Sequence, residues 1–173
     1  ALVSNNWSPV YALKIGPSAY ANRNVKYVDS LYEKSYSPEY PIQVASDLYL
    51  RNDWRDSLYR TIYDVPLLEK KEYLYSDLGY YMLQDIIEQE CDTMLYPYCW
   101  YNFYAPLGAE TLGFLPLSRF PKERIIHTEN DIFFLSLLIH VYVHYPVAAL
   151  LCGVSGHSGL FSCANELAKM MKM

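Results

Sequence analysis

The residues best suited to chemistry lie in two short segments, and the first of these holds Tyr75, Ser76 and Asp77. The apolar pattern that follows predicts a helix from Ser76 to about Glu90, so these side chains stand at its N-terminus. The free N–H groups and the positive potential there could lower the pKa of a phenol or steady an oxyanion. Taken alone, the segment is more simply interpreted as an ordinary N-cap.

The second segment is the glycine-rich run 153–159, which contains Ser155 and His157. At first glance it resembles a nucleophile elbow. The G-x-S-x-G pattern fails, however, because the fifth position counted from Gly156 is Leu160. A tight turn that packs close to another stretch of backbone is the favoured interpretation.

Other patterns argue against a metal, a cofactor and a complete serine nucleophile. His140 and His144 are spaced as on one helix face, but Val141 stands where H-E-x-x-H requires Glu, so we expect neither metal nor cofactor. None of the lysines follows a serine by three residues, so S-x-x-K is absent. Without C-x-x-C, the cysteines are expected to be buried free thiols, or one or two disulfides in an oxidising compartment; they are Cys91, Cys99, Cys152 and Cys163.

The elements that must position these residues are predicted to be mainly helical, with long loops. Besides 76–90, a helix is expected within 41–63, where apolar residues recur every four positions from Leu50 to Ile62, and another over 96–104. The helix over 76–90 carries an apolar stripe that is expected to face the core, formed by Leu78, Met82, Leu83, Ile86 and Ile87.

The remaining segments show weaker periodicity. Residues 1–40 are interpreted as an irregular N-terminal segment, and 108–123 as a loop with Gly and Pro. Residues 131–143 are apolar and ambiguous between helix and strand, and strand signals elsewhere are too few to build a sheet. We therefore predict a single partial domain over 1–173, mostly helical from 41 to 173, with the glycine-rich turn near its end.

Composition limits the classes of function. Among 173 residues, 14 are Lys or Arg and 19 are Asp or Glu, and the resulting net charge of −5 argues against a basic nucleic-acid-binding face. Hydrophobic residues make up 52% and charged residues 19%, which excludes a disordered chain. The apolar stretches are shorter than the roughly 20 residues of a membrane-spanning helix, so no membrane span is expected.

Several blocks, taken in order over roughly 40–173, resemble the serine β-lactamase and penicillin-binding-protein-like superfamily. The nearest likeness is to the branch of class C β-lactamases, D-alanyl-D-alanine carboxypeptidases and esterases, in a variant found in Bacteroidetes-type proteins. The blocks are Tyr75-Ser-Asp-Leu-Gly-Tyr-Tyr, Phe103-Tyr-Ala-Pro-Leu-Gly, Thr111-Leu-Gly-Phe and Gly156-His-Ser-Gly-Leu-Phe-Ser.

The resemblance implies an active-site cleft between a helical and an α/β domain, where the motifs S-x-x-K, Y-x-N and K-T-G or H-x-G meet. Only Y-x-N maps here, with Tyr75 as the catalytic tyrosine and Asp77 in place of Asn. An ionised Asp cannot donate a hydrogen bond to a substrate carbonyl as Asn does. The resemblance gives Ser76, Ser155 and His157 substrate-binding roles. The nucleophile and the last strands are expected to lie outside this chain.

The resemblance thus implies a periplasmic or otherwise exported serine hydrolase. It would act on β-lactams, D-Ala-D-Ala peptides or esters through an acyl-enzyme, with a small molecule or peptidoglycan-like substrate as its partner. The isolated chain is expected to be inactive. A first alternative is a non-catalytic binding or scaffolding domain of the same fold. A second is an unrelated helical interaction protein, for which Tyr75 and Asp77 would face bulk solvent.

Overall fold

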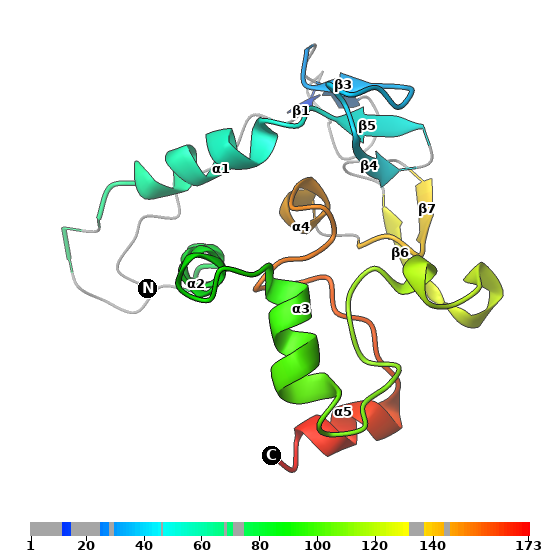
Figure 1. Cartoon of the computed structure of the whole chain (residues 1–173). Helices are drawn as coiled ribbons and strands as arrows, with labels where there is room; N and C mark the ends of the chain where they lie inside the picture. The colour runs from blue at the N-terminus through cyan, green and yellow to red at the C-terminus, as the bar shows by residue number, and fades with distance from the viewer. Residues whose placement is uncertain are drawn as a thin grey trace.

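The computed structural model describes residues 12–14, 25–27, 30–45, 47–67, 69–70, 75–131, 137–143 and 146–173 (Figure 1). Within these ranges helices hold more residues than strands, and the strands form three small antiparallel sheets. The prediction of a mainly helical chain with long loops is therefore confirmed only in part, because the described architecture is mixed. None of the described helices combines the length and apolar character needed to cross a membrane.

The strands are short and pair with near neighbours in sequence. They are β1 (Ala12–Lys14) with β2 (Val25–Tyr27); β3 (Tyr32–Glu33), β5 (Leu48–Leu50) and β4 (Ile42–Ala45) in that spatial order; and β6 (His127–Asp131) with β7 (Leu137–His140). The spacing from Leu50 to Ile62 predicts a helix within 41–63, but β4 and β5 occupy the first part of that range, so the prediction is wrong at Leu50. Leu48 and Leu50 are buried with the half-buried Tyr49 between them, which is the two-residue alternation of a strand.

The helices agree better with the sequence prediction. They are α1 (Trp54–Tyr63), α2 (Leu78–Glu90), α3 (Leu95–Cys99), the π-helical η1 (Trp100–Tyr104), the short 3₁₀ turns η2 (Pro116–Ser118) and η3 (Lys122–Arg124), α4 (Pro146–Leu150) and α5 (Ala164–Met170). The predicted helices over 76–90 and 96–104 are confirmed as α2 and as α3 with η1, and the later part of 41–63 is confirmed as α1. The predicted loop over 108–123 contains η2 and the start of η3.

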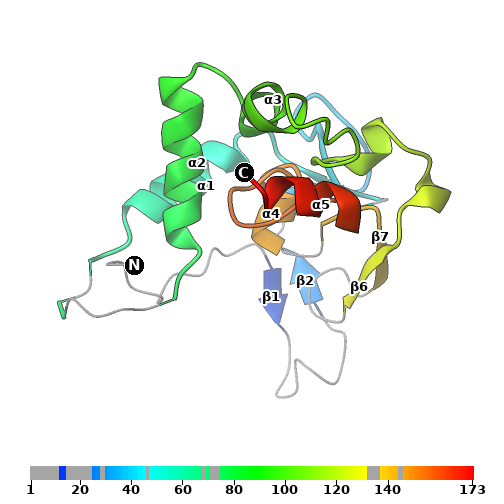
Figure 2. The same cartoon turned by 90° about the horizontal axis from the view of Figure 1, so that it is seen from below.

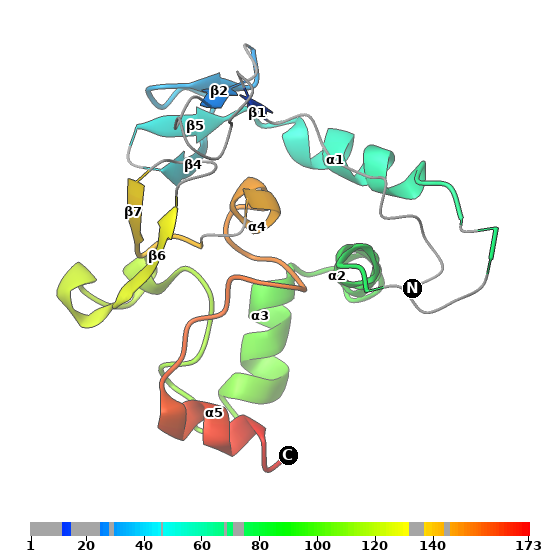
Figure 3. The same ribbon diagram turned by 180° about the vertical axis from the view of Figure 1, so that it is seen from behind.

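The core is organised around α4, which lies between the β3–β5–β4 sheet and α2 (Figures 1 and 3). Leu150 packs with Val44 and Leu50 of the sheet. Val147 and Leu151 pack on the other side, against a cluster from α1 and α2 that contains Leu58, Tyr59, Ile62, Leu78 and Tyr81. Because α4 belongs to both clusters, it links the sheet to the helices that carry the predicted site.

Helix α2 crosses α1, as the view from below shows (Figure 2), and it turns an unexpected face to the interior. Its buried residues are Leu78, Tyr81 and Gln84. Leu83 is 54% exposed and Ile86 is 51% exposed, so the predicted apolar stripe is wrong for these two residues. Polar contacts made by the inward face, described below, account for this orientation.

Candidate functional site

The first predicted segment lies at the start of α2, where the sequence placed it. Tyr75 is 69% exposed, whereas Ser76 and Asp77 are half-buried. The Tyr75 hydroxyl donates to Asp77 Oδ1 at 3.3 Å, and Ser76 Oγ accepts from the N–H of Leu78 at 3.3 Å. The exposure of Tyr75 matches what the interaction-protein alternative expects, but the partial burial of Asp77 does not.

The second segment forms the expected tight turn. Ser155 and Ser158 exchange two backbone hydrogen bonds of 3.2 Å, which leaves Gly156 and His157 at the tip. A Cβ added at Gly156 would lie 2.6 Å from the carbonyl oxygen of Tyr80 on α2. Only glycine permits this approach, so the prediction of a glycine-rich turn packed against another backbone is confirmed.

Ser155 and His157 of the turn form a chain of polar contacts with Tyr81 of α2. Ser155 Oγ lies 2.7 Å from His157 Nδ1, and His157 Nε2 lies 3.3 Å from the hydroxyl of Tyr81. The Tyr81 and His157 rings meet edge-on, with centroids 4.6 Å apart. A neutral imidazole donates through one nitrogen and accepts through the other, so it can serve both hydroxyls at once.

Burial lowers the pKa of His157 below its usual value, while the negative charge of Asp77 acts in the opposite direction. Burial is the larger influence and favours the neutral imidazole. Asp77 precedes Tyr81 by four residues and hence shares its face of α2. The structure thus brings Asp77 into electrostatic contact with His157 and brings Ser155 and His157 together, while Tyr75 stays outside this group.

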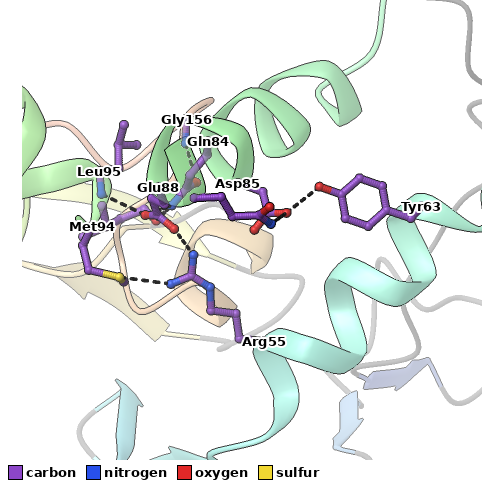
Figure 4. A network of polar contacts seen from close by, with 10 residues as sticks. Arg55, Tyr63, Gln84, Asp85, Glu88, Met94, Leu95 and Gly156 are labelled. Carbon is purple, nitrogen blue, oxygen red and sulfur yellow. Dashed lines mark hydrogen bonds and ion pairs between the residues drawn. The ribbon is translucent and has the colours of Figure 1, made fainter. Parts of the chain in front are cut away.

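Gln84 fixes the turn to α2 (Figure 4). Its side chain is only 2% exposed. Gln84 Oε1 accepts from the N–H of Gly156 at 2.9 Å, and Gln84 Nε2 donates to the carbonyl of Val154 at 3.2 Å. Gln84 Nε2 also donates to Glu88 Oε1 at 3.1 Å. The residues that flank Ser155 are therefore both held by one buried amide.

Glu88 extends this network to two other helices. Its carboxylate pairs with the guanidinium of Arg55 on α1 and accepts from the N–H of Leu95 at the start of α3. Arg55 also lies 3.5 Å from the sulfur of Met94. Figure 4 shows these side chains converging from α1, α2 and the chain before α3. A buried carboxylate requires such partners, which explains why α2 turns this polar face inward.

Beside the turn lies a groove of about 410 Å³ between α2, the α3–η1 segment and residues 155–160. Ser155 and His157 line it, as do Leu83 and Ile87 of α2. The side chains of Tyr75, Ser76 and Asp77 are not among those that line it. The two predicted segments therefore meet through α2 without sharing one cavity.

The other residues singled out in the sequence are the two histidines of the segment 140–144 and the four cysteines. His140 lies in β7, and His144 lies outside the described residues, so their pairing stays untested. In the part of the chain that the structure describes, no group of three or more His, Cys, Asp or Glu side chains is placed to hold a metal. The four cysteines are free, as the first expectation had it, but the expected burial is wrong because Cys91, Cys152 and Cys163 are exposed.

Sequence reasoning missed Tyr81 and Gln84. A signal existed, since Asp77, Tyr81, Gln84 and Glu88 follow the spacing of a single helix face. Polar residues at that spacing usually indicate a solvated face, so only the partners in the folded chain identify this one as buried.

Comparison with known proteins found no match among family models, curated proteins or solved structures. The likeness to penicillin-recognising hydrolases therefore rests on the sequence blocks alone.

Proposed function

We propose that this chain is the helical part of a serine hydrolase that acts on β-lactams, D-Ala-D-Ala peptides or esters through an acyl-enzyme. One structural observation supports the proposal more than any other. The block that begins at Tyr75 packs directly on the block that begins at Gly156 through Tyr81 with His157, and Gln84, one turn further along α2, bonds to Gly156. Segments of one active site lie close together in a folded chain, so this contact supports the proposal.

In this proposal Tyr75 takes part in proton transfer at the mouth of α2, and the half-buried Asp77 orients it through their hydrogen bond. The nucleophile comes from outside the 173 residues, because S-x-x-K is absent from them. The isolated chain therefore forms no acyl-enzyme. A periplasmic or exported location belongs to the same proposal, since cell-wall peptides are met there.

Incubation of the isolated chain with a fluorescent penicillin and with p-nitrophenyl acetate tests its inactivity. We expect neither a labelled band nor a burst of nitrophenol. Covalent labelling would overturn this half of the proposal.

The gene on either side of the chain tests the other half. We expect S-x-x-K upstream and K-T-G or H-x-G downstream, and a coding sequence without S-x-x-K would refute the hydrolase. In the longer protein, Tyr75→Phe should slow acylation by about 100-fold or more, the usual contribution of a positioned acid or base. Tyr101→Phe is the matched control, because Tyr101 is 74% exposed on η1 and should leave the rate unchanged.

A non-catalytic binding domain of the same fold is the second candidate. The groove beside the turn favours it, because Ser155 and His157 line a cavity of ligand size that Tyr75 does not reach. If the longer protein carries S-x-x-K and labels with penicillin, this candidate is excluded.

A further inference from the structure

The groove beside the turn has uncharged walls. Its lining comes entirely from described residues, and none of these is Asp, Glu, Lys or Arg. Leu83 and Ile87 of α2 form one wall, and Leu95 and Phe114 contribute to the others. Its volume of about 410 Å³ lies within the range of small-molecule sites, which are mostly apolar with a few convergent polar groups.

Burial favours the neutral form of three titratable groups in the lining. Burial raises the pKa of the Cys99 thiol and of the Tyr104 phenol, so neither ionises at pH 7. Burial lowers the pKa of His157, which favours its neutral imidazole form. An anionic ligand group would therefore lose its water in this groove without meeting an opposite charge among the lining residues.

The polar groups of the lining include Ser155, His157 and Ser158 at the turn. The hydroxyl of Ser155 bonds to His157 Nδ1 at 2.7 Å. A hydroxyl has one hydrogen and two lone pairs, so Ser155 Oγ keeps acceptor capacity beyond that bond. The amide of Gln84, also in the lining, is already committed to Gly156, Val154 and Glu88.

We propose that the groove binds an uncharged, largely apolar small molecule with one hydroxyl or aryl-amine donor, and that the donor faces Ser155. The apolar body lies against Leu83, Ile87 and Phe114. This site takes no carboxylate, so it is distinct from one that would hold the carboxylate of a β-lactam or peptide. The inference does not depend on the hydrolase proposal.

Two dyes that share one ring system test the charge selectivity on the full 173-residue chain. N-phenylnaphthylamine is neutral and carries an N–H donor, whereas anilinonaphthalene sulfonate adds a negative charge. We expect saturable binding of the neutral dye at one site per chain. The sulfonate dye should bind about tenfold more weakly or worse, because its charge must be desolvated without a partner.

A matched pair of variants on α2 locates the site. Leu83→Asp places a charge in the wall of the groove, while Ile86→Asp places one outside the groove, and both positions are about half exposed. We expect Leu83→Asp to weaken binding of the neutral dye about tenfold or more, by the same desolvation cost. Ile86→Asp should leave binding unchanged. Far-UV circular dichroism and melting curves verify that both variants fold.

Competition tests the hydrogen bond at the turn. Naphthol, which carries a hydroxyl, should displace the dye at lower concentration than naphthalene does, and Ser155→Ala should remove this difference. The proposal is overturned if the dye binds without saturation, if the sulfonate dye binds equally well, or if Leu83→Asp and Ile86→Asp behave alike. Equal displacement by naphthol and naphthalene in the native chain would overturn the donor requirement.

Discussion

Replacement of Gln84 by Met should destabilise the chain out of proportion to the small change in shape. Met has a similar length and volume, so packing is largely kept while the amide is lost. Gln84 is 2% exposed and makes three hydrogen bonds, to the backbone of Gly156 and Val154 and to the carboxylate of Glu88. The substitution therefore isolates the contribution of these bonds.

The expected loss follows from the individual bonds. At about 1 kcal/mol each, three bonds contribute about 3 kcal/mol to the free energy of unfolding. Gly156 is exposed, and water can replace part of its bond, so we expect a loss of about 2 kcal/mol. For a chain of this size, that corresponds to a fall of roughly 4 to 8 °C in melting temperature.

Urea unfolding followed by circular dichroism measures the difference, with the slope of the transition as a check that the unfolded state is unchanged. Gln89→Met is the matched control. Gln89 is exposed on the same helix, and its amide donates to Asp85 Oδ2 at 2.7 Å. We expect a change within about 0.5 kcal/mol. Equal losses in the two variants would refute a structural role for the buried amide. Faster hydrogen exchange of the Gly156 amide in Gln84→Met is a second expected result.

Three further predictions concern backbone strain and titration. Cys152 is exposed with a φ of 60°, so Cys152→Gly should stabilise the chain by about 1 kcal/mol in urea unfolding, by relief of left-handed strain. Gly113 has a φ of 152°, and an added Cβ would lie 2.6 Å from a side-chain nitrogen, so Gly113→Ala should cost about 1 to 3 kcal/mol. The folded-state pKa of His157 is lowered, so the unfolded chain takes up a proton first as the pH falls through about 6.5. Stability should therefore rise with pH across this window, and His157→Gln should flatten that part of the profile of unfolding free energy against pH.

Each of these predictions has a control at a related position. Cys91 caps α2 with a φ of −99°, so Cys91→Gly should bring no gain, and a gain equal to that of Cys152→Gly would contradict the strain argument. Gly79 lies in α2 with no atom within 4 Å of an added Cβ, so Gly79→Ala should stabilise, in contrast to Gly113→Ala. A pH profile that is unchanged in His157→Gln would show that burial does not shift the titration of this residue.

The sequence predicted the long elements well because their signals are local. The apolar period and the polar helix start marked α2, and the glycines marked the turn. The predicted helix within 41–63 included Leu50 because Leu50 continues the four-residue spacing of Trp54, Leu58 and Ile62, although it lies in β5. The contact of Tyr81 with His157 joins positions 76 residues apart, and no local pattern carries such information.

The face that α2 buries could not be predicted for a related reason. Hydrophobicity alone favours turning Leu83 and Ile86 inward. The polar face is buried instead because Glu88 pairs with the guanidinium of Arg55 and Gln84 bonds to the backbone of the turn. These partners are distant in sequence, so only the assembled structure identifies them.

The bonds of Gln84 also bear on the order in which the chain assembles. Its partners Val154 and Gly156 lie 70 and 72 residues later in the sequence. Closing so long a loop is entropically costly, so these contacts form after the local helices. During synthesis, α2 is made long before the turn that satisfies its inward face. On the nascent chain α2 can already pack against α1, and we expect the amide of Gln84 to gain its backbone partners only when the turn emerges.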